Sequence, residues 1–249
     1  MPEVAVSAHR GGAEWHRPGS WEAYRSAVAT GAEYVEFDVR RLVDGQLVCH
    51  HDPLAGRSGR PLRELTYRQL CAAAGYEVPT VAGVAGGLAG RAAGHVDLKE
   101  AGYEDEVVRL VTELLGEDGF VVTSLVDASI ARIAREFPRV RTALSLGRGR
   151  AEIPPGGLLA TRRRELWPLA RVRACGTRWV AADRTLARYG VLRQCARVGI
   201  GVMVWTVDET AQIDRFLSDP RVAVLVTNRP RHAVERRARI TGTAPPAPG

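Results

Sequence analysis

Short runs of β-branched and other apolar residues alternate along the chain with longer stretches whose apolar residues recur every three or four positions. The short runs are typical of buried strands, and the longer stretches are typical of helices that pack one face against a sheet. The predicted strands are Val4–Ala8, Tyr34–Val39, His95–Leu98, Phe120–Thr123, Val140–Leu146, Trp179–Ala182, Gly201–Thr206 and Val222–Val226. The predicted helices are Trp21–Thr30, Leu65–Ala74, Val81–Ala93, Glu104–Leu115, Ser129–Phe137, Thr185–Val198 and Glu209–Leu217.

Residues that favour helix ends flank several of these stretches. Ser20, Asp127 and Asp208 each precede a helical run, where a side-chain oxygen can accept a hydrogen bond from the first turn. Gly31 and Gly199 follow two of the runs, where glycine commonly ends a helix. These residues support the predicted order of strands and helices.

About eight strand–helix units in succession predict a parallel sheet, and eight strands close a barrel. We therefore predict a single α/β domain, a TIM-type (β/α)₈ barrel over residues 1–240. The rival, an open doubly wound sheet, would place a GxGxxG turn after its first strand, and this chain has none there. Asp44-Gly45 predicts a tight turn, with residues 46–51 returning beside the second strand. Residues 241–249, which are rich in Pro, are predicted to be a disordered tail.

Composition narrows the class of protein. With 45% hydrophobic and 25% charged residues, the chain can build a large core. No apolar stretch is long enough to span a bilayer, and the first residues are typical of a strand, so a cytoplasmic location is expected. The four cysteines lack metal-site spacing and are expected to be reduced.

The chain carries a net charge of +7, and its basic residues are almost entirely arginine. Most of these arginines are scattered among acidic residues and form no basic stripe with interleaved aromatics, so no nucleic-acid binding is expected. A positive field would still draw a small anionic substrate toward a cleft.

Three acidic residues lie at the ends of predicted strands. Glu36 and Asp38 are two positions apart on one strand and therefore share a face, and Asp97 ends the next strand. In a barrel these ends meet at one mouth, where active sites are built. Either the acids pair with barrel arginines, or they hold a divalent cation that offsets their repulsion. An all-oxygen ligand set favours Mg²⁺ or Ca²⁺ over zinc.

Two histidines lie at similar positions: His9 follows the first strand, and His51 ends the hairpin return. Histidine can give and take a proton near neutral pH, so this pair is the candidate acid and base. Arg10 and Lys99, the only lysine of the chain, are candidates for binding a phosphate group. Trp205 either walls the substrate site or packs the barrel top.

These residues occur in motifs with a characteristic order. His9-Arg10-Gly11, Glu36-Phe37-Asp38-Val39, Asp44-Gly45 and His51-Asp52-Pro53 resemble the opening signature of glycerophosphodiester phosphodiesterases, a family with a phosphatidylinositol-phosphodiesterase-like TIM barrel. Later landmarks extend the resemblance almost to the end of the chain: Val78-Pro79-Thr80, Asp97-Leu98-Lys99, Thr123-Ser124-Leu125, Val204-Trp205-Thr206-Val207 and Val226-Thr227-Asn228-Arg229-Pro230.

The resemblance implies metal-dependent hydrolysis of glycerophosphodiesters to glycerol 3-phosphate and an alcohol. It implies Glu36, Asp38 and Asp97 as metal ligands, His9 and His51 as base and acid, and Arg10 and Lys99 as phosphate contacts. The chain also departs from the family pattern. Asp97 stands where Glu is usual, Pro18-Gly19-Ser20-Trp21 replaces Pro-Glu-Asn-Thr, and Thr227-Asn228-Arg229-Pro230 replaces Thr-Asp-x-Pro.

Two other interpretations stay open. One is a lipid phosphodiesterase resembling sphingomyelinase D or the phosphoinositide phospholipases. The sequence shows no amphipathic or aromatic segment that would insert into a membrane, so no stable membrane association is expected. The other is a non-catalytic, ligand-binding relic of the fold. Loss of the Pro-Glu-Asn-Thr residues favours a relic, whereas retention of the acids and histidines favours an enzyme.

Overall fold

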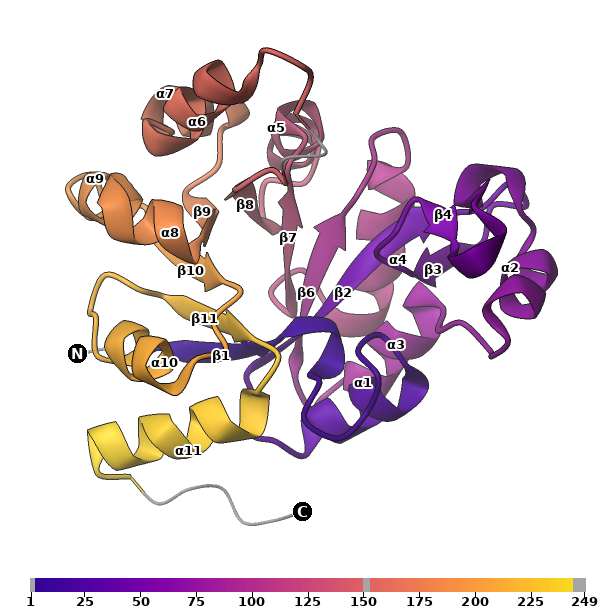
Figure 1. Cartoon of the computed structure of the whole chain (residues 1–249), viewed down its shortest axis with the longest axis horizontal. Helices are drawn as coiled ribbons and strands as arrows, with labels where there is room; N and C mark the ends of the chain where they lie inside the picture. Colours follow the sequence, from indigo (N-terminus) through magenta and orange to yellow (C-terminus); the bar gives the residue numbers. More distant parts are fainter. Residues whose placement is uncertain (1–2, 150–152, 244–249) are drawn as a thin grey trace.

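The computed structural model describes residues 3–149 and 153–243, and its centre is a closed parallel barrel (Figure 1). β1 pairs in parallel with β2 on one side and with β11 on the other, which closes the ring. This closure confirms the predicted TIM-type barrel. The barrel strands are β1 (Ala5–Ala8), β2 (Tyr34–Arg41), β6 (Ala93–Leu98), β7 (Phe120–Ser124), β8 (Arg141–Leu146), β9 (Trp179–Asp183), β10 (Gly201–Trp205) and β11 (Val224–Thr227).

Helices surround the barrel in Figure 1 and cover its outer face. Apolar residues on alternate strand positions, such as Phe37 and Leu144, face these helices and are fully buried. The surrounding helices are α1 (Trp21–Val28), α3 (Val81–Leu88), α4 (Glu104–Leu115), α5 (Asp127–Glu136), α6 (Leu158–Leu166), α7 (Leu169–Cys175), α8 (Arg184–Leu186), α9 (Leu192–Ala196), α10 (Thr210–Leu217) and α11 (Pro230–Thr241). Among the described residues, no helix is long and apolar enough to cross a bilayer.

A second, smaller core fills the barrel interior. Its members are inward-facing residues of five strands, and all are buried: Val121, Ala143, Ala181, Met203, Val224 and Val226. Polar inward-facing residues such as Ser7 and His95 lie among the strands as well, and they are also buried. Because these apolar residues fill the interior, a site lined by polar residues can form only at the carboxyl ends of the strands.

The connection after β2 forms a small unit of its own on one side of the barrel (Figure 1). β3 (Leu47–Cys49) returns antiparallel to β2, as the Asp44-Gly45 turn predicts. It is followed by β4 (Leu54–Ala55), η2 (Gly56–Ser58), β5 (Arg60–Pro61), η3 (Leu62–Glu64) and α2 (Tyr67–Ala74). A separate apolar cluster that includes Val48, Leu65 and Leu70 stabilises this unit.

Several predicted elements differ from the structure. The predicted helix Thr185–Val198 is broken into α8, a π-helical turn η5 (Ala187–Val191) and α9, with Gly190 at φ 145° inside the turn. Helices α6, α7 and α11 were not predicted, because their many arginines obscure the apolar period. Of the predicted tail 241–249, Thr241 still belongs to α11, and residues 244–249 lie outside the described residues.

Two of the three predicted helix caps were also wrong. Ser20 caps α1 by accepting from the backbone N–H of Ala23 at 3.2 Å. Asp127 instead lies inside α5 and pairs with Arg171, and Glu209 takes the cap position expected for Asp208. Asp208 instead accepts hydrogen bonds from the backbone and side chain of Asn228, just after β11.

Candidate active site

The turn after β1 positions the first two candidate residues. η1 (His9–Gly11) holds Arg10 in the left-handed region, at φ 50° and ψ 36°, which is costly for a residue with a side chain. Gly11 approaches the backbone of α1 so closely that an added Cβ would lie 2.6 Å from the carbonyl carbon of Ala23. A Cβ on Gly12 would lie 2.9 Å from the ring of Pro230. Close packing of this turn therefore fixes where His9 and Arg10 point.

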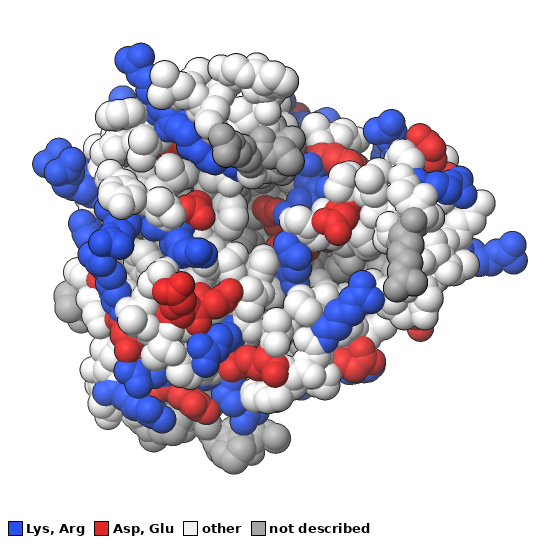
Figure 2. Space-filling model, viewed as in Figure 1, with Lys and Arg blue, Asp and Glu red and all other residues white. Residues whose placement is uncertain are grey.

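The three predicted acids meet at the mouth. Glu36 and Asp38 lie two positions apart on β2, and Asp97 is the register partner of Asp38 on β6. Each offers a carboxylate oxygen, and these oxygens all lie within 4.8 Å of one another. Glu36 and Asp38 are almost fully buried, with 3% and 2% of their surface exposed. In Figure 2 this face is hollowed near its middle, with acidic and basic side chains around the hollow.

The two predicted phosphate-binding cations contact these acids. Nε of Arg10 lies 2.9 Å from Oδ2 of Asp38, without the alignment of a hydrogen bond. Nζ of Lys99 lies 2.7 Å from Oδ1 of Asp38 and 2.5 Å from Oδ2 of Asp97. The cluster thus places two cations against three carboxyl groups in a buried site.

These contacts shift the pKa values of the acids in opposite directions. Burial, followed by the charge of Asp38, raises the pKa of Glu36 well above its usual range. Burial alone would also raise the pKa of Asp38, but Lys99 and Arg10 outweigh it and hold that pKa far below its usual range. Burial opposes the charge on Lys99, yet Asp97 and Asp38 raise its pKa. Asp38 is therefore charged at neutral pH, and Glu36 favours its protonated form.

His9 is oriented by two residues that sequence reasoning missed. Its Nδ1 lies 2.8 Å from Oδ1 of Asn228, and its Nε2 lies 4.0 Å from Oε2 of Glu36. Asn228 in turn donates through Nδ2 to Oδ2 of Asp208 at 2.8 Å. Burial, followed by the charge of Arg10, lowers the pKa of His9. The ring is therefore neutral at neutral pH, with Nε2 turned toward the acids.

His51 lies just after β3. Its Nδ1 is 2.7 Å from Oδ1 of Asp52, and Arg40 holds the His51 carbonyl oxygen through Nε and Nη2, at 3.0 and 2.9 Å. The charge of His51 also contributes to the low pKa of Asp38. Its side chain is 46% exposed, unlike that of His9 at 19%.

A chain of buried hydrogen bonds supports Asp97 from inside the barrel. Oγ1 of Thr123 donates to Oδ1 of Asp97 at 2.5 Å. Nε2 of His95 lies 3.2 Å from the same hydroxyl, and Oγ of Ser7 lies 3.0 Å from Nδ1 of His95. Because the hydroxyl proton of Thr123 points to Asp97, His95 donates to Thr123 and accepts from Ser7. Polar residues at inward strand positions were the signal that could have revealed this chain.

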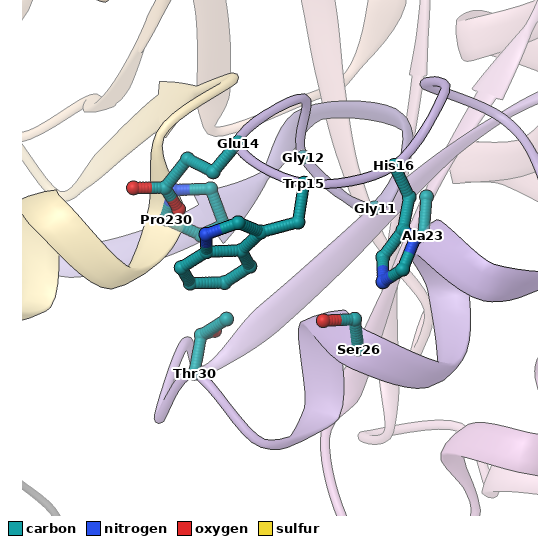
Figure 3. A pocket seen from close by; sticks show the side chains of 9 residues that line it. All are labelled: Gly11, Gly12, Glu14, Trp15, His16, Ala23, Ser26, Thr30 and Pro230. Carbon is teal, nitrogen blue, oxygen red and sulfur yellow. The ribbon is translucent and has the colours of Figure 1, made fainter. Parts of the chain in front are cut away.

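Trp205 and His16 lie in two separate surroundings. Trp205 ends β10 and packs beside Gly147, where an added Cβ would lie 3.2 Å from its ring. His16 lies on the loop between η1 and α1 and lines a small cavity with Trp15 and Ser26 (Figure 3). That loop is held by Glu14, which accepts from the backbone N–H of Arg231 at 3.1 Å. His16 is therefore not part of the acid cluster.

The acid cluster fits a divalent metal ion in its donor chemistry. Glu36, Asp38 and Asp97 supply only oxygen atoms, the ligand type that hard divalent cations prefer. Oδ1 of Asp38 is buried and has no aligned hydrogen-bond donor, although Lys99 lies close to it. Such an oxygen is available for a metal bond.

Known proteins share this fold, and one family matches the chain over most of its length. The profile of the glycerophosphoryl diester phosphodiesterase family matches residues 9–232. No curated protein is similar enough to count as a match. Solved structures with the same fold include a glycerophosphodiester phosphodiesterase from Parabacteroides distasonis, with a TM-score of 0.75 and 19% identity, covering 96% of this chain and 98% of that one.

Two further structures agree with this fold. The glycerophosphodiester phosphodiesterase of Thermotoga maritima has a TM-score of 0.74 and 18% identity, covering 94% and 99% of the two chains. A phosphodiesterase from Oleispira antarctica, solved with the product sn-glycerol-3-phosphate, has a TM-score of 0.71 and 15% identity, covering 94% and 96%. Barrel and family match together define a phosphoric diester hydrolase. The chain belongs to the glycerophosphoryl diester phosphodiesterase family.

Proposed function

We propose that this enzyme hydrolyses glycerophosphodiesters to glycerol 3-phosphate and an alcohol, with a divalent ion at the three acids and two histidines as base and acid. The observation that carries the proposal is the meeting of Glu36, Asp38 and Asp97 within 4.8 Å, with Nε2 of His9 only 4.0 Å from Glu36. A metal-ligand set and a neutral imidazole at one barrel mouth are the parts that phosphodiester cleavage needs.

His9 is suited to act as the base. Asn228 accepts from its Nδ1–H, so Nε2 carries a free lone pair on the side of the acids. The lowered pKa of His9 keeps that lone pair available at neutral pH. The proton comes from the nucleophile, which is either water or the 2-hydroxyl of the glycerol group. Attack by the 2-hydroxyl would form a cyclic phosphate that water then opens.

His51 is suited to act as the acid. Oδ1 of Asp52 lies 2.7 Å from its Nδ1 and orients the ring so that Nε2 is left for the substrate. The proton on Nε2 would pass to the oxygen of the leaving alcohol as its bond to phosphorus breaks. The hydrogen bonds from Arg40 to the His51 backbone fix the position of this residue.

Arg10 and Lys99 are proposed to contact the phosphate. Both now lie against Asp38, and either cation can offer its remaining N–H groups to a non-bridging oxygen. Trp205, at the end of β10, is proposed as a wall for the apolar part of the substrate.

Glu36, Asp38 and Asp97 would hold the ion, and their all-oxygen set favours Mg²⁺ or Ca²⁺. When bound, a divalent ion supplies positive charge beside a phosphoryl oxygen. Metal binding requires Glu36 to lose the proton that its burial favours, and the ion would compensate for that cost.

A panel assay tests the proposal directly. Purified enzyme is incubated with glycerophosphocholine, glycerophosphoethanolamine and glycerophosphoglycerol, and release of glycerol 3-phosphate is measured. EDTA should abolish release, and Mg²⁺ or Ca²⁺ should restore it. Phosphorus NMR of the reaction would detect a cyclic phosphate if the 2-hydroxyl attacks.

Variants separate acid–base chemistry from metal binding. His9→Ala and His51→Ala should each lower kcat by about 10²- to 10⁴-fold while leaving metal affinity nearly unchanged. His16→Ala is the matched control, since His16 lines the separate small cavity. Near-normal turnover in both His9→Ala and His51→Ala would refute the assignment of base and acid.

A further inference from the structure

Helix α6, which lies at the upper left in Figure 1, exposes an unusual set of side chains. Along a single face of α6 lie the residues that we call the α6 stripe: Leu159, Ala160, Arg163, Arg164 and Trp167, which together line an open groove. All are exposed, Leu159 at 83% and Trp167, the residue just after the helix, at 62%. Large apolar side chains of this exposure, one at either end of an arginine pair, require a functional explanation.

Helix α6 is attached to the segment that follows β8, at the carboxyl end of the barrel. Glu165, on the opposite face of α6, is buried and accepts at Oε1 from the backbone N–H groups of Gly147 and Arg148, at 2.9 and 2.8 Å. These two residues directly follow β8, and Gly147 packs beside Trp205. Arg162 pairs with Oε2 of Glu165 at 2.6 Å and neutralises it. The stripe is therefore coupled to the mouth through one buried carboxylate.

The neighbouring turn η5 also exposes a large ring next to an arginine. Tyr189 is 70% exposed, and the guanidinium of Arg188 lies 5.9 Å from the centre of its ring. Nε2 of Gln194 donates to the carbonyl oxygens of both Leu166 and Gly190, which ties η5 to the end of α6. In Figure 2, basic side chains are spread over the region that α6 to α9 occupy in Figure 1.

The charge of the stripe decides which partner it fits. Glu165, the neighbouring acid on α6, is buried and already paired with Arg162. Nη2 of Arg164 lies 4.0 Å from Oδ2 of Asp127 on α5, but that carboxylate already pairs with Arg171, so the two stripe arginines still give this face an excess of positive charge. Two copies of the chain would bring like charges together, which disfavours a symmetric dimer through this face. Exposed Leu and Trp beside arginines instead match the boundary between anionic headgroups and acyl chains.

We propose that the α6 stripe docks reversibly on an anionic lipid surface and so presents the active-site mouth to phosphodiesters held there. Trp167 and Leu159 would enter the headgroup region, while Arg163 and Arg164 contact lipid phosphates. Sequence patterning predicted no such segment, because α6 itself was not recognised. The inference goes beyond the proposed function and does not depend on it, since docking is measured without turnover.

Vesicle flotation tests the proposal with the whole protein. Wild-type protein should float with vesicles of phosphatidylcholine containing phosphatidylglycerol, but not with pure phosphatidylcholine, and added salt should weaken the binding. Arg163→Gln/Arg164→Gln should weaken partition roughly 10- to 30-fold. Leu159→Ala/Trp167→Ala should also weaken it. Hydrolysis of water-soluble glycerophosphodiesters should stay unchanged in both variants, as none of these residues touches the acid cluster.

A matched control separates local charge from net charge. Arg63→Gln/Arg139→Gln removes the same two charges from well-exposed positions, at 77% and 72%, outside the α6 stripe. This control should float like the wild type. Equal flotation of wild type and both α6 variants, or no flotation of the wild type, would overturn the proposal. Self-association that Trp167→Ala abolishes, without vesicle binding, would overturn it in favour of a dimer face.

Discussion

Asn228 accepts a hydrogen bond from Nδ1 of His9 at 2.8 Å, across a sequence separation of 219 residues. The closing contact between β1 and β11 makes this possible, because Ala8 and Thr227 are register partners. Asp208 fixes the direction of the amide by accepting from its Nδ2. The proposed base, His9, is thus oriented by a neutral amide that a carboxylate supports, whereas the family pattern has Asp at the position of Asn228.

Exchanging the amide of Asn228 and the carboxylate of Asp208 should restore the activity that changing Asn228 alone removes. Asn228→Asp alone sets two carboxylates face to face about 2.8 Å apart, and we expect kcat/KM to fall about 10- to 100-fold. Asn228→Asp/Asp208→Asn keeps one amide and one carboxylate and should recover most of the loss. A carboxylate beside His9 raises the pKa of the ring. Because the proposed base must be unprotonated to act, the acidic limb of the kcat/KM profile should move to higher pH.

Gln212→Glu serves as the control for this exchange. Its Nε2 donates to Oε2 of Glu209 at 2.8 Å, so the change also sets two carboxylates against each other, but on the exposed face of α10. Its pH profile should follow the wild type. A profile for the exchanged pair that coincides with the wild type would show that Asn228 does not orient the base.

Thr123 is expected to support metal binding without contacting the ion. Thr123→Val removes the hydroxyl that donates to Oδ1 of Asp97 at 2.5 Å and keeps the shape of the side chain. A carboxylate that loses a supporting hydrogen bond typically binds metal about 10- to 100-fold more weakly. Titration calorimetry with Ca²⁺ should show this loss. Thr142→Val, which removes a buried hydroxyl bonded to Thr177 instead, should bind as the wild type does. Equal losses in both variants would contradict the role of Thr123.

The barrel and most of the candidate cluster were predictable from local pattern. The β-rich runs place Glu36 and Asp38 on one strand face, and that geometry holds regardless of how the chain folds elsewhere. The ends of parallel strands also meet by necessity, which brought Asp97 and His9 into the prediction. Fold class and family are confirmed by the closed barrel and the family match.

The supporting residues were not predictable in the same way. Asn228 and Asp208 gain their roles only when β11 closes against β1, and Asp208 alone suggests no more than a helix cap. His95 lies within an apolar run, and its partner Ser7 is 88 residues away. Helix α6 was missed for another reason. Three consecutive arginines and two exposed leucines hide its period, since its apolar residues do not all face the core.

His95 should make the stability of the metal-free protein depend on pH. Burial lowers its pKa to about 4, from an ordinary value of 6.5. Between pH 4 and 6.5 the unfolded chain binds a proton at His95 that the folded protein does not. The contribution of His95 to the free energy of unfolding is therefore fully present above pH 6.5. It falls by about 3 kcal/mol as the pH drops to 4. Glu36, whose pKa is raised, makes the free energy of unfolding change with pH in the opposite direction. Its effect cancels when the wild type is compared with a variant that differs only at His95.

The comparison uses His95→Gln, which keeps hydrogen-bonding groups but cannot titrate. The free energy of unfolding is measured with urea in the presence of EDTA at several pH values from 4 to 7. Plotted against pH, it should rise more steeply for the wild type than for the variant. The wild type should gain about 3 kcal/mol more than the variant between pH 4 and 6.5. Parallel curves would show that His95 keeps its ordinary protonation inside the barrel.

Close packing of the His9–Gly12 turn predicts a stability difference between two glycines of nearly equal φ. Gly11 has φ 78° and Gly45 has φ 81°, so alanine at either position incurs a similar backbone cost of about 1 kcal/mol. At Gly45 nothing lies within 4 Å of the new Cβ, whereas at Gly11 it would meet the backbone of Ala23 and Tyr24 at 2.6 and 2.8 Å. Gly11→Ala should therefore lower the free energy of unfolding by about 1–3 kcal/mol more than Gly45→Ala. Urea unfolding at a fixed m-value measures both, and equal losses would mean that α1 shifts freely to admit the methyl group.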